Sequence, residues 1–220
     1  MSKIISHIAI AATLGVSACA QFPDDAVSRQ AETKVAYAAT SPIADGMNTI
    51  PPAGFVGFCM RTPAACTNRG AMSEARVALD DKTAAMLVAV NDRVNNAIIY
   101  ESDPEHYGVA NRWELNPEYG DCKDYALAKR EALRAAGLPD SALRIAIVRT
   151  PQDELHAVLT VDTDKGALVM DSLTSDIRPW SATSYQWLER QAGDDPLHWV
   201  SLRSDGRTAA ARVSLRGQES

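Results

Sequence analysis

The chain has 220 residues, of which 46% are hydrophobic and 23% charged, and its 22 Lys and Arg against 28 Asp and Glu give a net charge of −6. This composition is typical of a globular protein and excludes a disordered or fibrous one. An acidic chain without a basic cluster lacks the electrostatic footprint of a nucleic-acid-binding protein, so we expect no nucleic acid partner. The length suits one domain with a small appendage.

Residues 1–20 have the features of a secretory signal peptide. Lys3 provides the positive start, and the apolar run over 8–16 is shorter than the ~20 residues that span a bilayer. The stretch that ends at Cys19 resembles a bacterial lipobox, which predicts lipidation of Cys19 and attachment to the membrane through that lipid alone. The sequence Ala18-Cys19-Ala20 also fits an A-x-A cleavage site, which would release a soluble protein. Both alternatives predict export to the periplasm.

The remaining chain divides into three parts. Residues 21–49 are Ala-rich and polar with little periodicity, and we expect a flexible linker there. The folded domain is expected over 50–203, and a loose polar tail over 204–220. Nothing in the sequence demands more than a monomer.

Within the domain, Cys59 and Cys66 flank a short Pro-containing loop. An exported protein meets an oxidising environment, so this pair could close a disulfide; two independent buried thiols are the alternative. Cys122 has no evident partner in either case. An unpaired cysteine in an exported protein is a candidate reactive thiol.

The hydrophobic patterns predict an α+β domain in which a helix is followed by an antiparallel sheet. Ser73 is the expected N-cap of a first helix, while Asp121 and Gly137 enclose a second. The expected elements are helices over 73–99 and 122–136, strands over 143–149, 155–162 and 167–172, a short helix over 184–191 and a last strand over 198–203.

Cys122 lies in the first turn of the second helix. The free N–H groups and the helix dipole at such an end favour the thiolate, which is the nucleophilic form of cysteine. Lys123 adds to this effect, whereas the carboxylates of Asp121 and Asp124 oppose it. A cysteine that only packs in the core is the alternative interpretation.

His156 and Asp171 lie on two strands that the sequence predicts to form a hairpin. If Asp164 and Lys165 form its tip, residues whose numbers sum to 329 face one another, which gives one consistently apolar face. In this register His156 and Asp171 form a diagonal cross-strand pair with α-carbons roughly 7–8 Å apart. A carboxylate that orients a histidine toward a nucleophile is the arrangement of a catalytic triad.

Three segments resemble the bacterial transglutaminase-like cysteine peptidases, a branch of the papain-like superfamily. They are the nucleophile helix Gly120-Asp121-Cys122-Lys123-Asp124-Tyr125-Ala126, the segment His156-Ala157-Val158-Leu159 and the segment Met170-Asp171-Ser172-Leu173. Their order and spacing match that family over about residues 50–200. The resemblance implies a papain-like fold, with the nucleophile helix packed on an antiparallel sheet, and a periplasmic cysteine endopeptidase with Cys122, His156 and Asp171 as its triad.

The resemblance also implies partners. The best understood members release cells from biofilms by cleaving large surface adhesins, so the expected partner is a protein substrate, with an inner-membrane receptor as regulator. Those members bind calcium through acidic residues around the nucleophile, which makes Asp121 and Asp124 candidate ligands. They carry an acidic residue directly after the cysteine, where this chain has Lys123. We therefore expect a weakened calcium site and no cofactor required for the chemistry.

The expected reaction is acyl transfer to Cys122, with His156 moving the proton and Asp171 fixing the imidazole. Water as acceptor gives a peptidase, and a lysine amine gives a protein-crosslinking acyltransferase. Two further alternatives stay open: a non-catalytic envelope lipoprotein that binds a partner, and a zinc site built from one Cys, one His and one Asp.

Overall fold

The structure of the protein is a computed structural model that describes residues 42–68 and 75–202. The predicted signal peptide, Cys19, most of the expected linker, Ser73 and the expected tail lie outside these residues. No helix in the described part of the chain is long and apolar enough to cross a membrane.

Antiparallel strands form one sheet in the order β1-β9-β8-β4-β5-β6-β7. Their bounds are Asp45–Thr49 (β1), Leu143–Arg149 (β4), Leu155–Thr163 (β5), Gly166–Met170 (β6), Arg178–Pro179 (β7), Gln186–Gln191 (β8) and Trp199–Leu202 (β9). Two short strands, β2 (Ile99–Tyr100) and β3 (Tyr119–Gly120), pair in parallel just before the helix that carries Cys122.

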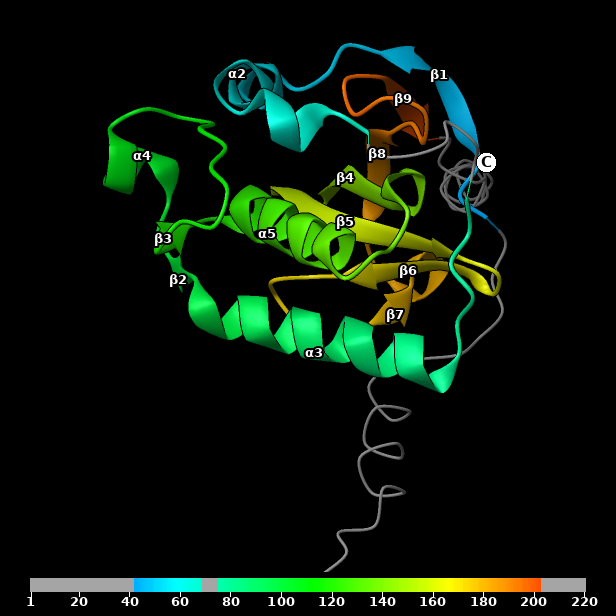
Figure 1. Ribbon diagram of the computed structural model, residues 1–220. Helices are drawn as coiled ribbons and strands as arrows, with labels where there is room; N and C mark the ends of the chain where they lie inside the picture. The colour runs from blue at the N-terminus through cyan, green and yellow to red at the C-terminus, as the bar shows by residue number, and fades with distance from the viewer. Residues whose placement is uncertain (1–41, 69–74, 203–220) are drawn as a thin grey trace, which may run out of the picture.

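The main helices are α2 (Ala53–Arg61), α3 (Asp81–Ala97), α4 (Asp103–Tyr107) and α5 (Cys122–Ala135), with 3₁₀ turns at Pro63–Cys66, Asp140–Ala142 and Trp180–Ala182. Figure 1 shows α5 lying over β4 and β5, with α3 alongside it. The main core fills the space between these helices and the sheet, around Phe58, Leu133 and Leu159. A smaller apolar cluster that includes Val158 and Trp187 covers the opposite face. The expected α+β fold, with the nucleophile helix on an antiparallel sheet, is confirmed.

Local signals in the sequence set both ends of α5. The Asp121 carboxylate accepts the N–H of Lys123, and the Asp124 carboxylate accepts the N–H of Asp121, so the two form a capping box. At the other end, Gly137 adopts φ 93°, and the N–H groups of Gly137 and Leu138 bond back to the carbonyls of Arg134 and Leu133. This Schellman motif needs a residue that tolerates positive φ, which explains the glycine.

The hairpin of β5 and β6 has the register that the sequence predicts. Leu159 pairs with Met170, Val161 with Leu168, and Thr163 with Gly166. The strands differ slightly in length from the prediction, because β5 extends to Thr163 and β6 ends at Met170.

The first part of the domain differs from the prediction in three places. One is α2, a helix over Ala53–Arg61 where the sequence patterns predict no element. β1 lies within the expected linker, and it forms a strand because β9 offers a free edge with which it pairs. The helix expected over 73–99 begins at Asp81 and not near Ser73. Val77 is instead bonded through its backbone to Asp162 and Asp164 at the tip of the hairpin, which holds this stretch extended until Asp80 caps α3.

The prediction of a short helix over 184–191 is wrong. Residues 186–191 form β8, which pairs with β4 on one side and β9 on the other. A strand between two others satisfies its backbone groups on both sides, and this long-range pairing decides the conformation.

Candidate active site

Cys122 is the first residue of α5, with Asp121 as its N-cap. It is the free cysteine of the described residues and is half-buried. The backbone N–H of Ala157 on β5 donates a hydrogen bond of 3.4 Å to its Sγ atom. A helix N-terminus and a backbone donor both favour a negatively charged sulfur. The packing of α5 on β5 therefore brings the thiol to the strand that carries His156.

His156 and Asp171 form a buried pair. The Nε2 atom of His156 lies 2.7 Å from Oδ1 of Asp171, and their exposed fractions are 6% and 3%. Asp171 also accepts the N–H of Leu173 on Oδ1 at 3.0 Å and the hydroxyl of Tyr185 on Oδ2 at 2.5 Å. These two further donors hold the carboxylate in place at the end of β6, so that it fixes the imidazole ring.

The charges of this group are strongly coupled. Burial lowers the pKa of His156, but its hydrogen bonds to Asp171 and Cys122 outweigh burial and raise the pKa to about 9. Burial raises the pKa of Asp171, whereas His156, Leu173 and Tyr185 together lower it below its ordinary value. At neutral pH the geometry therefore favours an imidazolium between a carboxylate and the sulfur.

Acidic side chains gather beside Cys122, and Lys123 lies among them. Oxygens of Asp103, Asp121 and Asp124 lie within 4.8 Å of one another. The Nζ atom of Lys123 lies 2.6 Å from Oδ2 of Asp103 and 2.5 Å from Oδ2 of Asp121. Burial lowers the pKa of Lys123, but these hydrogen bonds raise it above its ordinary value, so the ammonium stays charged.

Asp124, a predicted calcium ligand, accepts hydrogen bonds from the backbone. Its two oxygens accept the N–H groups of Glu114 and Asp121 at 2.8 and 3.0 Å, and burial raises its pKa to about 6. Calcium takes six to eight oxygen ligands. Because the Lys123 ammonium occupies the space between two of the carboxylates and both oxygens of Asp124 already accept backbone N–H groups, the cluster as arranged does not fit a calcium ion.

Cys122 and His156 open onto a cleft of about 450 Å³. Its walls are largely apolar and include Pro52, Pro104 and Leu155. Trp113 also borders the cleft but is 2% exposed, packs edge-on against Phe55 with ring centroids 5.2 Å apart, and donates its indole N–H to Asn111. An open, mainly apolar groove beside a nucleophile suits a peptide chain.

The two upstream cysteines meet near α5. Cys59 on α2 and Cys66 in the following 3₁₀ turn form a disulfide. Arg130 and Arg134 of α5 both donate to the carbonyl of Ala65, next to Cys66. The disulfide-closed turn thus buttresses the helix that carries Cys122.

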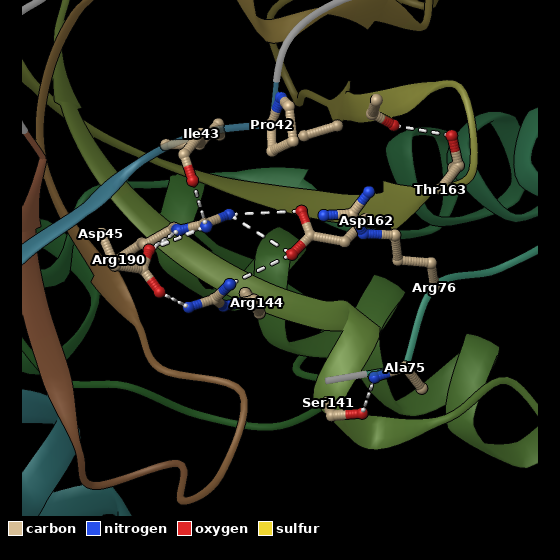
Figure 2. Close-up of a pocket in the computed structure, with 12 residues that line it drawn as sticks. Pro42, Ile43, Asp45, Ala75, Arg76, Ser141, Arg144, Asp162, Thr163 and Arg190 are labelled. Carbon is tan, nitrogen blue, oxygen red and sulfur yellow. Dashed lines mark hydrogen bonds and ion pairs between the residues drawn. The ribbon is translucent and has the colours of Figure 1, made fainter. Parts of the chain in front are cut away.

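A second hollow is lined by two aspartates and three arginines, of which Arg144 and Arg190 pair with the aspartates (Figure 2). Asp45 on β1 lies 2.6 Å from Arg144 on β4 and 2.8 Å from Arg190 on β8, and Asp162 on β5 also pairs with both arginines. The four paired side chains lie on β1, β4, β5 and β8, so this network joins four strands and holds β1 on the sheet. It contains none of the predicted catalytic residues.

Sequence reasoning missed three contributors to the site. Asp103, on α4, pairs with Lys123; Tyr185 bonds Asp171; and Glu189, on β8, lines the cleft. Each lies many residues along the chain from the side chain that it contacts or accompanies, so the local sequence patterns do not reveal it. The one available signal was the predicted pair of His156 and Asp171, because a buried carboxylate needs further hydrogen-bond donors.

Papain-like cysteine peptidases carry their nucleophile at the start of a helix that packs on an antiparallel sheet, and this chain has that architecture. The family model of the bacterial transglutaminase-like cysteine proteinases (BTLCP) matches residues 45–207, which is most of the chain. The chain belongs to this family of cysteine peptidases, and the resemblance seen in its sequence is confirmed.

Solved structures of Legionella pneumophila LapG are similar to this chain. The EGTA-treated form is 30% identical with a TM-score of 0.42, and the match covers 48% of this chain and 61% of that one. The calcium-bound form is 26% identical with a TM-score of 0.46, and the match covers 59% and 78%. The chain thus spans less than two thirds of the EGTA-treated LapG chain. A comparison with curated proteins found no match.

Proposed function

We propose that this protein is an exported cysteine endopeptidase in which Cys122 is the nucleophile, His156 the proton carrier and Asp171 the residue that orients His156. The observation that carries the proposal is the position of Cys122 against the backbone of Ala157, the residue next to an imidazole that pairs with a carboxylate held by two further donors. Family membership supports the reaction class, since the family is one of cysteine proteinases.

In this reaction the Cys122 thiolate attacks the peptide carbonyl carbon and forms a C–S bond. The oxyanion lies against the N–H of Cys122, which is a free donor of the first helical turn. The C–N bond then breaks as the His156 imidazolium protonates the leaving amine. Water next attacks the thioester, giving its proton to neutral His156, and the C–S bond breaks to release the acid and the thiolate.

We also propose that no divalent metal is required. One LapG structure is calcium-bound. In this chain, the ammonium of Lys123 between Asp103 and Asp121 supplies positive charge beside the nucleophile without an ion. Without Lys123, the carboxylates of Asp103, Asp121 and Asp124 would repel one another and the neighbouring thiolate. The ammonium of Lys123 therefore stabilises the start of α5.

The leader over 1–20 supports a periplasmic location, with a lipid anchor if Cys19 is modified. There the substrate would be an envelope or surface protein, such as an adhesin that holds cells in a biofilm, and an inner-membrane receptor would control access to it. A lysine amine as acceptor would make the protein a crosslinking acyltransferase, and an unreactive Cys122 would leave a binding lipoprotein.

One experiment separates these functions. The protein and its Cys122→Ala variant are incubated with an unstructured protein such as casein and a biotin-labelled primary amine, with EGTA present. Fragments formed only with Cys122 support the peptidase. Biotin incorporated into intact casein would identify an acyltransferase. If neither product exceeds that of Cys122→Ala, and a thiol-directed probe labels Cys122 no faster than a peptide cysteine, the catalytic proposal is wrong.

A further inference from the structure

Glu189 is a carboxylate inside the cleft that the proposed mechanism does not use. It lies on β8, is half-buried, and lines the same cleft as Cys122 and His156. Among residues 42–68 and 75–202 no cation forms an ion pair with it. The other two carboxylates of the cleft, Asp103 and Asp121, are both bonded to Lys123. Its polar neighbour is the neutral side chain of Thr49, so Glu189 is the acidic side chain of the cleft that can still take a positively charged partner.

The sheet register places Glu189 at a defined distance from the nucleophile. Ile147 on β4 pairs with Ala157 on one side and with Glu189 on the other, so the three residues form a row across the sheet. Residues paired in this way present their side chains on one face. Ala157 donates its N–H to the Cys122 sulfur. With strands about 4.8 Å apart, Glu189 lies roughly 10 Å along the sheet from that contact.

An extended peptide advances about 3.3 Å per residue, so roughly 10 Å corresponds to two or three residues. Between the two ends of this row the wall is apolar, formed by Ile147 and neighbouring Leu155. A substrate that follows the row with its scissile carbonyl at Cys122 would bring one side chain, two or three positions away, against Glu189.

We propose that Glu189 selects a Lys or Arg side chain two or three residues from the scissile bond. This inference rests on the proposed peptidase function and names its substrate class. Burial raises the pKa of Glu189, as expected for a carboxylate that lacks a counter-charge. A bound lysine or arginine side chain would supply that charge. If Glu189 were neutral, this attraction would be lost and the basic side chain would bind more weakly.

The test is to map cleavage sites in a peptide mixture prepared from cellular protein with a glutamate-specific endopeptidase, which leaves Lys and Arg inside the peptides. The protein, Glu189→Gln and Glu189→Asp are compared by mass spectrometry. Glu118→Gln is the matched control, because Glu118 is an exposed carboxylate that does not line the cleft. Cys122→Ala defines the background, and thermal unfolding checks that each variant folds.

The protein and Glu118→Gln should show Lys or Arg enriched on the order of tenfold at one such position, the ratio that about 1.4 kcal/mol of transition-state binding gives. Glu189→Asp should keep that preference, and Glu189→Gln should still cleave but lose it. The same preference in Glu189→Gln and in the protein would overturn the role of Glu189 and leave the peptidase intact. Cleavage no greater than with Cys122→Ala would overturn the peptidase and this proposal together.

Discussion

The Nε2 atom of His156 lies 2.7 Å from Oδ1 of Asp171, which leaves Nδ1 as the ring nitrogen available to Cys122. One carboxylate oxygen thereby determines which nitrogen moves the proton. Tyr185 and Leu173 in turn determine where that oxygen lies. The orientation of the proposed base thus depends on β5, β6 and the start of β8, and its distance from the nucleophile on how α5 packs against β5.

Replacing Asp171 with Asn should remove the charge interaction between residue 171 and His156. Asn keeps the shape but removes the charge that helps to raise the pKa of His156 to about 9, so this pKa should fall toward or below its ordinary 6.5. Peptide hydrolysis should fall by roughly 10³ to 10⁴. NMR titration of the His156 ring measures the pKa. Tyr185→Phe, which removes one bond to Asp171 and keeps the charge, should have a much smaller effect; equal titration of His156 in both variants would contradict this account.

Replacing Lys123 with Glu should create a calcium site where the protein has an ammonium. Without the Lys123 ammonium, the carboxylates of Asp103 and Asp121 lose their positive partner, and Glu adds more ligands of the type calcium prefers. In 5 mM calcium the melting temperature of Lys123→Glu should rise by several degrees over that in EGTA, as ligand binding of about 2 kcal/mol produces. Lys82→Glu, an equal charge change at an exposed site, should not respond. A calcium-dependent rise in the unmodified protein would refute the metal-free site.

Lys129 gives the free energy of unfolding a pH dependence of its own. Its side chain is fully buried, its Nζ atom has no hydrogen-bond partner among the described residues, and burial lowers its pKa to about 7 despite the opposing charge of Asp171. Between about pH 7 and 10.5, Lys129 is therefore protonated in the unfolded chain but largely neutral in the folded one. Because unfolding then takes up a proton, the free energy of unfolding rises with pH over this range.

Lys129→Met should accordingly be more stable than the protein by about 2 to 4 kcal/mol below pH 7. The difference should shrink as the pH rises from 7 toward 10.5, because only above the ordinary lysine pKa of 10.5 is Lys129 neutral in both states. Urea unfolding at pH 6, 8 and 10 measures it. A variant that is less stable at every pH would mean that the ammonium has a favourable partner in the folded protein.

The sequence predicts the parts of the site that local signals determine. The two-residue tip at Asp164 and Lys165, together with the apolar alternation, is enough to fix the register of β5 and β6, from which the closeness of His156 and Asp171 follows. The capping box and the glycine after α5 likewise place Cys122 in its first turn.

Long-range pairing determines the rest, and sequence patterns do not contain it. Residues 186–191 become a strand because β4 and β9 flank them, and this alone puts Glu189 in the cleft. Asp103 reaches Lys123 because β2 and β3 pair in parallel and return the chain to the start of α5. The spacing of these residues along the chain gives no sign of either contact.

The most direct test of the account is the rate at which iodoacetamide alkylates Cys122 at different pH values, followed by mass spectrometry on the peptide that carries it. Hydrogen bonding raises the pKa of His156 to about 9, so a positively charged imidazolium should lie beside the Cys122 sulfur at neutral and mildly acidic pH. We predict that the rate stays high at pH 6, where an ordinary thiol of pKa ~8.5 is almost entirely protonated, and that His156→Ala abolishes this reactivity. A rate that rises with pH like that of a free thiol in both proteins would contradict the triad.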